Sequence, residues 1–332
     1  MADGRLGAGA HALWYVGPGR AEIRGEAVPA PASGEVEVRA LHGAVSRGTE
    51  RLVLAGRVPP SEYTRMRGPH MGGAFPFPVK YGYATVGRVE AGPEGLAGRT
   101  VFALHPHQSR FILPAGAVTP VPDEVPARRA VLAANMETAL NATWDAAPGP
   151  AGRIAVVGAG VVGALVAWLC GRTAGTHVTL VDVLESRAAL ARRLGVDFAL
   201  PAAAPRDCDL VFHASASAAG LATALGLAGD EATVIELSWY GDGDVAVPLG
   251  GAFHSRRLRL VSSQVGKVAP SHRAEWTPAR RLGAALDLLA DPALDVLLAP
   301  AVPFADLPRR LPDLLAPESE VLCPVIDYAG VT

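Results

Sequence analysis

The spacing of apolar residues changes along the chain. In the first third, apolar side chains recur at every second position over short stretches, which predicts half-buried strands. The clearest of these stretches are 35–41, 85–89 and 99–103. Proline and glycine separate them, as is typical of short strands joined by turns. The pattern therefore predicts a β-rich unit over residues 11–125.

The middle of the chain alternates between short apolar runs and segments with helical spacing. The runs that predict buried strands are 154–157, 178–181, 210–212, 233–237 and 258–261. The segments with helical spacing include 128–144, 216–227 and 277–289. This alternation predicts an α/β fold with a doubly wound parallel sheet. We expect residues 127–296 to form this domain, and residues 1–126 and 297–332 to form a β-rich second domain.

One segment of the predicted sheet carries a glycine motif. The apolar run 154–157 is followed by Gly158, Ala159, Gly160, Val161, Val162 and Gly163, and then by a helical apolar face. Gly158 permits a tight turn, Gly160 lets the backbone approach a pyrophosphate, and Gly163 lets helix and strand pack closely. The free N–H groups of the helix N-terminus attract phosphates. The motif predicts a dinucleotide site, although a purely structural turn is the alternative.

An acidic residue supports the dinucleotide interpretation. Asp182 ends the next apolar run, 19 residues after Gly163. A carboxylate there can accept hydrogen bonds from an adenosine ribose and repels a 2′-phosphate, so NAD(H) is favoured over NADP(H). Arg187 follows five residues later. It can weaken this preference, or it can flank the adenine or be solvated.

The bulk composition limits the possible functions. The 332 residues suit two domains, half of them are hydrophobic, and the formal net charge is −2. This charge gives no electrostatic basis for binding nucleic acid. The first residues lack the apolar core of a secretory signal, and no apolar run approaches the roughly 20 residues of a membrane span. Three scattered cysteines, Cys170, Cys208 and Cys323, indicate buried thiols in a reducing cytoplasm.

Four segments resemble motifs of the medium-chain dehydrogenase/reductase superfamily. They are Gly48-Thr49-Glu50, Gly82-Tyr83-Ala84-Thr85-Val86-Gly87, Thr138-Ala139-Leu140-Asn141-Ala142 and Val211-Phe212-His213-Ala214-Ser215. The resemblance spans nearly the whole chain. It implies a Rossmann domain joined to a GroES-like substrate domain, an NAD(P)-dependent enzyme and a homodimer. It also implies cofactor contacts from Thr138, Ala214, Ser215, Ser238 and Gln264.

The chain departs from the zinc-dependent members of that superfamily at the ligand positions. Where those members have cysteine, histidine and glutamate ligands, this chain has Arg47, Tyr83 and Ala84, and the remaining ligand position is Ala134. None of these is an ordinary zinc ligand. Three possible donors remain elsewhere: His105, His107 and Glu137. Their spacing fits no known ligand set, so we expect an enzyme without zinc.

A smaller subgroup gives a closer resemblance. The matching segments are Ser46–Glu50, Lys80–Tyr83, Pro106–Gln108, Asn135–Thr138 and Ser262–Gly266. They look like the subgroup that contains bacteriochlorophyllide a dehydrogenase, which oxidises a hydroxyethyl side chain to acetyl with NAD. The resemblance implies a secondary alcohol as the class of substrate. It does not identify a chlorin.

Without a metal, the proton of the alcohol needs another partner. The Tyr83 phenol stands at a former ligand position and can donate to a carbonyl or a developing alkoxide. Lys80 or Arg47 can lower the tyrosine's pKa or stabilise negative charge. Glu50 can hold Arg47 or relay a proton. The alternatives are a packed aromatic ring, an Arg47–Glu50 ion pair without a catalytic role, and a solvated lysine.

Two further residues are candidates for proton transfer. His107 can face the substrate and take up the proton, or it can be an ordinary strand-end histidine. Glu137 precedes Thr138, which the resemblance brings near the nicotinamide. Alternatively, its carboxylate simply stabilises the start of a helix.

These observations favour an NAD(H)-dependent oxidoreductase that acts on a secondary alcohol/ketone pair in the cytoplasm, in specialised metabolism. A reductase of conjugated C=C or C=N bonds is the first alternative. A non-redox enzyme for addition, elimination or cyclisation on the same fold is the second. In each case the expected partner is a small-molecule substrate.

Overall fold

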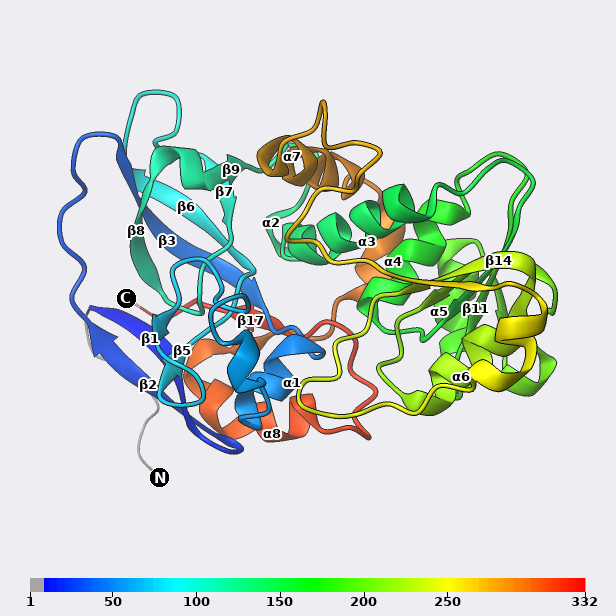
Figure 1. Cartoon of the computed structure of the whole chain (residues 1–332). Coiled ribbons are helices and arrows are strands. Elements are labelled where there is room, and N and C mark those ends of the chain that lie inside the picture. The colour runs from blue at the N-terminus through cyan, green and yellow to red at the C-terminus, as the bar shows by residue number, and fades with distance from the viewer. Residues whose placement is uncertain (1–8, 332) are drawn as a thin grey trace. The chain divides into compact units, whose positions relative to one another are not determined.

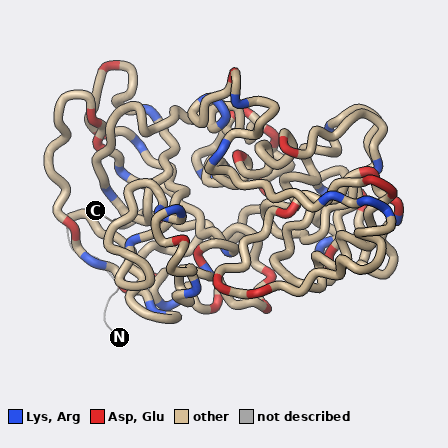
Figure 2. The backbone as a smooth tube through the Cα atoms, in the orientation of Figure 1, with Lys and Arg blue, Asp and Glu red and all other residues tan. Residues whose placement is uncertain are grey.

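The computed structural model describes residues 9–331, and their contacts divide them into two units (Figure 1). The first unit contains residues 9–134, Leu286–Ala290 and residues 298–331. The second contains Asn135–Ala285 and Asp291–Leu297. Basic and acidic residues are interspersed along the backbone of both units (Figure 2).

The second unit is built on a parallel sheet of six strands in the order β12-β11-β10-β13-β14-β15. In chain order, the strands are β10 (Arg153–Val157), β11 (His177–Val181), β12 (Asp197–Ala199), β13 (Cys208–His213), β14 (Ala228–Glu236) and β15 (Arg259–Ser262). The chain starts in the middle, builds outward through β11 and β12, and returns to the other side of β10 with β13. This is the doubly wound arrangement predicted from the apolar runs.

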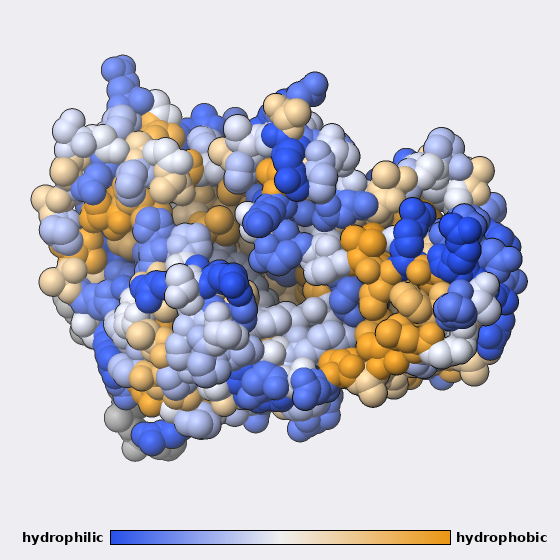
Figure 3. Space-filling view, viewed as in Figure 1, coloured by the Kyte–Doolittle hydropathy of each residue, from blue (hydrophilic) through white to orange (hydrophobic). Residues whose placement is uncertain are grey.

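Helices connect these strands. The connecting helices are α4 (Val161–Cys170), α5 (Arg187–Leu194) and α6 (Ala218–Leu227), whereas α3 (Ala133–Ala146) precedes β10 and α7 (Pro278–Leu288) follows β15. Helix α4 packs against β10 and β11, and α6 packs against β10 and β13. Apolar side chains also gather on the visible surface around α6 (Figure 3).

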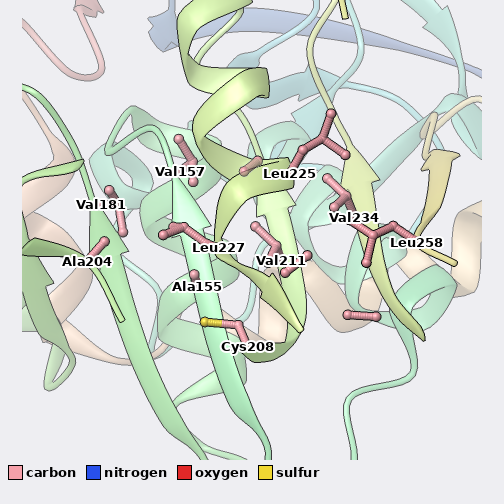
Figure 4. Packing of buried hydrophobic residues seen from close by; sticks show 13 residues of the cluster. Ala155, Val157, Val181, Ala204, Cys208, Val211, Leu225, Leu227, Val234 and Leu258 are labelled. Carbon is pink, nitrogen blue, oxygen red and sulfur yellow. The ribbon is translucent and has the colours of Figure 1, made fainter. Parts of the chain in front are cut away.

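The core beneath α6 is formed by small and branched apolar side chains (Figure 4). Ala155, Val211 and Val234, from β10, β13 and β14, are fully buried there. Leu225 of α6 covers them, with 3% of its surface exposed. These runs are continuous rather than alternating because both faces of the sheet are covered.

Two predicted helices differ from the structure. The segment 128–144 forms two helices, α2 (Ala127–Ala130) and α3. The Leu132 N–H bonds to the Arg129 carbonyl, three residues back, which interrupts the α-helical ladder. Helix α6 starts two residues later than predicted. Ala216 has a left-handed φ of 51°, and the Ser217 hydroxyl caps the helix by accepting the Gly220 N–H at 3.0 Å.

The first unit is β-rich. One sheet has the order β2-β1-β5-β4, and the other has the order β16-β17-β3-β6-β7-β9, with β8 also paired to β3. The bounds are β1 (Ala10–Gly17), β2 (Arg20–Glu26), β3 (Glu35–Ala44), β4 (Gly72–Gly73), β5 (Val79–Lys80), β6 (Thr85–Ala91), β7 (Thr100–Ala103), β8 (Arg110–Pro114), β9 (Val118–Pro120), β16 (Val302–Pro303) and β17 (Val325–Asp327). Strand β17 pairs with β3, so the end of the chain joins this unit.

Few helices belong to this unit. They are α1 (Thr49–Leu54), α2 and α8 (Leu307–Leu315). Short 3₁₀ turns of this unit cover Pro60–Glu62, Ala115–Ala117 and Phe304–Asp306. In the second unit, 3₁₀ turns cover Pro201–Ala203 and Pro292–Leu297, and a π-helical turn covers Leu249–Phe253. Along the part of the chain that the structure describes, no helix is long and apolar enough to cross a membrane.

Candidate cofactor and catalytic sites

The glycine motif forms a turn in which two positions have no room for a side chain. Gly158 has a φ of +108°, and a Cβ on it would lie 2.6 Å from the Ser215 amide nitrogen. A Cβ on Gly163 would lie 1.9 Å from the Gly158 carbonyl oxygen. Only glycine therefore allows α4 to start this close to β10 and β13.

Gly160 is different because the space beside it is open. No other described part of the chain comes within 4 Å of a Cβ placed there. Gly160 is the N-cap of α4, and Val161 and Val162 form the first helical positions, each partly exposed. The first amides of a helix have no partner within the helix. Open space next to these amides is what a phosphate group requires.

Asp182 is held against the same turn. One carboxylate oxygen accepts the Ala159 N–H at 2.7 Å, and the other accepts the Leu184 N–H at 2.9 Å. Each oxygen keeps a further lone pair for a ligand. The next residue, Val183, is 77% exposed. It offers an apolar surface that the sequence analysis missed. Its position directly after the acid that ends the strand could have indicated this surface. Arg187, the first residue of α5, is partly buried.

Ala214 and Ser215 follow β13, next to the glycine turn. The Ala214 N–H donates to the Val157 carbonyl at 2.8 Å, which fixes this segment beside β10. The strand order reverses between β10 and β13, and ligands of such sheets bind at the carboxyl ends of the strands at this reversal. The structure thus brings Gly158, Gly163, Ala214 and Ser215 together.

The other predicted cofactor residues lie on separate elements. Thr138 lies on α3, and Gln264 lies in the loop after β15, where its side-chain oxygen accepts the Gly266 N–H at 2.7 Å. The Ser238 hydroxyl accepts the Ala216 N–H at 3.0 Å, so Ser238 contacts the segment that follows Ser215.

A partly buried polar cluster adjoins this segment. Nδ1 of His213 is 2.8 Å from Oε2 of Glu236, and Nε2 is 2.7 Å from the Ser215 hydroxyl. The Tyr240 hydroxyl donates to Glu236 at 3.1 Å. Burial alone would raise the pKa of Glu236, but hydrogen bonds from His213 and from Ser238 outweigh it and hold the pKa below its ordinary value. Sequence analysis missed this cluster.

The first unit holds a second buried cluster around Glu50. This carboxylate has no exposed surface, and it accepts hydrogen bonds from the Tyr15 hydroxyl, the Ser46 N–H at 2.7 Å and Nε2 of His107 at 2.8 Å. Because Gly82 has no Cβ, the His107 ring can pack against it. A Cβ there would lie 2.8 Å from Nε2. Tyr15 is the member that the sequence analysis missed.

Tyr83 lies beside this cluster. The pKa of Tyr83 is raised to about 12, chiefly by burial and to a smaller extent by the charge of Glu50, while hydrogen bonds from Ser46 and Thr49 partly offset the shift. The interpretation that Lys80 or Arg47 lowers this pKa is wrong. The phenol stays protonated across the physiological pH range.

The two cations are engaged elsewhere. The Arg47 guanidinium donates to the backbone carbonyls of Leu314, Ala316 and Val321. It therefore anchors the C-terminal segment, and the expected pairing with Glu50 is replaced by these contacts. The Lys80 ammonium forms a 2.6 Å ion pair with Glu26 and bonds to the side chain of Gln108 at 2.9 Å.

Glu137 belongs to the second unit and forms a buried ion pair. Nε of Arg281 is 3.0 Å from its carboxylate, and the two side chains are 3% and 8% exposed, respectively. Burial raises the pKa of Glu137, and the charge of Arg281 partly offsets the shift. Arg281 also donates to Asn141 and to the carbonyl of Val265. The Glu137 carboxylate is thus paired with Arg281, a partner that the sequence analysis missed.

The remaining donors do not form a zinc site. Within residues 9–331, no group of three or more His, Cys, Asp or Glu side chains is placed to hold a metal ion. The His105 ring stacks on Phe111 with centroids 3.8 Å apart, and burial lowers its pKa to about 3. The Tyr83 phenol bonds to serine and threonine hydroxyls. These residues do not fit a zinc ion, so no step below uses one.

Solved structures of dehydrogenases share this fold. A putative zinc-binding dehydrogenase from Sinorhizobium meliloti 1021 bound to NADP superposes with a TM-score of 0.77 and 17% identity, over 97% of this chain and 100% of that one. L-idonate 5-dehydrogenase from Escherichia coli gives 0.77 and 13%, over 96% and 98%. Benzyl alcohol dehydrogenase from Acinetobacter calcoaceticus gives 0.76 and 15%, over 96% and 99%.

No protein-family model and no curated protein sequence matches the chain. The structural likeness therefore concerns the fold. It confirms the predicted fold class: a Rossmann domain with a doubly wound parallel sheet and a β-rich GroES-like domain, the architecture of these alcohol and polyol dehydrogenases.

Proposed function

We propose that this protein is an NAD(H)-dependent oxidoreductase that transfers a hydride between nicotinamide and a secondary alcohol/ketone substrate without zinc. The observation that carries the proposal is the turn at Gly158–Gly163. Side chains are excluded at Gly158 and Gly163, the space beside Gly160 is open, and Asp182 is held next to it. Gly158 and Gly163 also serve the packing of α4 on the sheet, whereas the open space at Gly160 and the nearby Asp182 carboxylate suit a bound dinucleotide.

The residues of the second unit fit the cofactor. The α4 N-terminus would hold the pyrophosphate, Asp182 the adenosine ribose and Val183 one face of the adenine. The Asp182 carboxylate favours NAD(H) because it repels a 2′-phosphate. When bound, the dinucleotide supplies or accepts the hydride. A similar fold binds NADP in the S. meliloti structure and NADH in an E. coli alcohol dehydrogenase, so the cofactor preference has to be measured.

Tyr83 is the proposed proton donor. A phenol with a pKa of about 12 is protonated at neutral pH and can donate a hydrogen bond to a substrate carbonyl. Hydrogen bonds from Ser46 and Thr49 stabilise the phenolate that forms if the proton is transferred. Glu50 and His107 are fully buried and hold the surrounding segments in place. They are positioning residues in this proposal.

The chemistry of the side chains at the positions of the zinc ligands supports the proposed zinc independence. Arg47 is a cation bound to three carbonyls, and Ala84 and Ala134 have no donor atom. The resemblance to the bacteriochlorophyllide a dehydrogenase subgroup points to the same class of secondary alcohol, and we propose a role in specialised metabolism. As a separate part of the proposal, we place the boundaries of the cofactor domain at residues 126/127 and 296/297.

Reduction of a conjugated C=C or C=N bond is the second candidate. The observation that favours it is the raised pKa of Tyr83. Such a reduction requires a hydrogen bond to the activating group and no strong base, which a protonated phenol provides. Turnover confined to enones or imines would identify this reaction.

The test compares wild-type protein with Tyr83→Phe and the control Tyr81→Phe. Tyr81 neighbours Tyr83, and among the described residues its hydroxyl hydrogen-bonds only to the Met66 carbonyl, at 3.4 Å. The wild type should bind NADH, contain no stoichiometric zinc and reduce ketones in a panel. Tyr83→Phe should lose about 10²–10⁴ in kcat with little change in NADH affinity, whereas the control should stay within about threefold. Stoichiometric zinc, or full activity of Tyr83→Phe, would contradict the proposal.

We further propose a cytoplasmic homodimer. The three cysteines are free and buried, which suits a reducing compartment.

The proposed dimer forms through the edge of the parallel sheet. Strand β15 ends the sheet, and Leu260 and Val261 on it are 37% and 40% exposed. Such an edge is a template for pairing with another strand. Light scattering should give a dimer, and Val261→Lys should shift it toward monomer. A monomeric wild type would refute the homodimer.

A further inference from the structure

The cluster beside the glycine turn is a chain of hydrogen bonds with a defined direction. The Gly220 N–H donates to the Ser217 hydroxyl at 3.0 Å, and that hydroxyl lies 3.0 Å from the Ser215 hydroxyl. Ser215 lies 2.7 Å from Nε2 of His213, and Nδ1 of His213 lies 2.8 Å from Glu236. The chain ends at a carboxylate, which can only accept.

The carboxylate determines which ring nitrogen carries the proton. Glu236 also accepts the Ser238 N–H at 2.7 Å and the Tyr240 O–H at 3.1 Å. Against the effect of burial, hydrogen bonds from His213 and from Ser238 hold the pKa of Glu236 below its ordinary value. An ionised Glu236 requires an N–H at Nδ1 of His213. With the imidazole neutral, Nε2 then carries a lone pair and accepts the Ser215 O–H.

These bonds determine how the Ser215 hydroxyl can bond to a ligand. A serine hydroxyl has one hydrogen and two lone pairs. Its hydrogen is directed to His213, and one lone pair receives the Ser217 O–H. One lone pair remains. His213 is fully buried, whereas Ser215 is partly exposed, so Ser215 is the member that a ligand can reach.

Ser215 lies beside the glycine turn of the proposed cofactor site. Its amide nitrogen lies 2.6 Å from the place where a Cβ on Gly158 would be. We propose that His213 and Glu236 are positioning residues that make Ser215 a hydrogen-bond acceptor for a donor group of the bound dinucleotide, either a ribose hydroxyl or the carboxamide N–H₂. This inference rests on the proposed NAD(H) function and specifies how one part of the site recognises its ligand.

Helix α6 offers a matched pair of substitutions. A Cβ on Gly220 would lie 2.0 Å from the Ser215 oxygen and 2.9 Å from Nε2 of His213, whereas a Cβ on Gly226 meets nothing within 4 Å among the described residues. Both Gly→Ala changes raise helix propensity equally. Only Gly220→Ala forces the Ser215 hydroxyl away from His213.

The first experiment measures the Kd of NADH by fluorescence titration for wild type, Gly220→Ala and Gly226→Ala. Gly220→Ala should raise Kd by about three- to tenfold, the loss of one hydrogen bond. Gly226→Ala should stay within about twofold of the wild type. Repeating the titration with the reduced 3-acetylpyridine analogue, which lacks the carboxamide N–H₂, separates the two donors. A ribose donor keeps the Gly220→Ala effect, whereas a carboxamide donor abolishes it.

The second experiment observes the tautomer directly, without cofactor. The ¹⁵N chemical shifts of labelled histidines, with His213 assigned by its loss in His213→Phe, should show Nδ1–H and an unprotonated Nε2 at neutral pH. A proton at Nε2 would turn Ser215 into a donor and overturn the inference even if Gly220→Ala fails to fold. Equal NADH affinity of folded Gly220→Ala and Gly226→Ala would overturn it too. If the wild type binds no NADH, the proposed function itself fails.

Discussion

Replacing Arg281 by methionine should strongly destabilise the second unit, because it breaks a buried ion pair. Arg281 and Glu137 form a pair with 3% and 8% of their side chains exposed, and Arg281 also donates to Asn141 and Val265. Arg281→Met leaves the Glu137 carboxylate buried without its cation. Breaking a buried pair in this way costs about 3–5 kcal/mol.

The opposite substitution should cost less. In Glu137→Gln, Arg281 keeps its bonds to Asn141 and Val265, so the expected loss is about 1–2 kcal/mol, one hydrogen bond to a charged group. The double variant Glu137→Leu/Arg281→Met removes both charges together. It should recover at least half of the loss caused by Arg281→Met, because no charge is left buried.

Thermal unfolding followed by tryptophan fluorescence is a suitable assay. Four of the five tryptophans, Trp144, Trp168, Trp239 and Trp276, lie in the second unit, so the signal reports mainly on it. For a unit of this size, each kcal/mol shifts Tm by about 2–4 °C, and Arg281→Met should therefore lower Tm by about 6–20 °C. A shift below about 2 °C, or a double variant no better than Arg281→Met, would refute the reasoning.

Three further predictions follow from the same structure. Gly163→Ala should weaken NADH binding by at least about tenfold, since its Cβ would lie 1.9 Å from the Gly158 carbonyl; unchanged affinity would speak against the turn as the cofactor site. Asp182→Asn should shift the NADP(H)/NAD(H) affinity ratio toward NADP(H) by about tenfold, because a charge that repels a 2′-phosphate is removed; an unchanged ratio would rule out this role. Burial raises the pKa of Glu137 above its ordinary value of 4.5, so its contribution to stability is present below that pH and is lost as pH rises through the folded pKa. Glu137→Gln should remove this part of the pH dependence of Tm, and an identical pH profile would contradict the assignment.

Several features could be predicted from the sequence because their causes are local. The turn at Gly158–Gly163 depends on backbone conformation and on missing Cβ atoms, which glycine encodes directly. The strands of the parallel sheet follow from continuous apolar runs, since both faces of the sheet are covered. The N-terminal strands follow from alternation, and their punctuation by proline and glycine is also local.

The side-chain partners depend on tertiary structure alone. Glu50 is three residues from Arg47, which suggested an ion pair, yet its carboxylate bonds to Tyr15 on β1 and to His107 in the segment between β7 and β8. Arg47 instead bonds to the carbonyls of Leu314, Ala316 and Val321 near the end of the chain.

The polar clusters of the second unit have the same origin. His213 and Glu236 meet because β13 and β14 are neighbours in register, and Arg281 reaches Glu137 across 144 residues of chain. Backbone requirements and periodicity are properties of a few consecutive residues, so the sequence determined the glycine turn, the strands and the fold class. Which buried charge meets which partner depends on the order and register of strands far apart in the chain, and only the tertiary structure decided it.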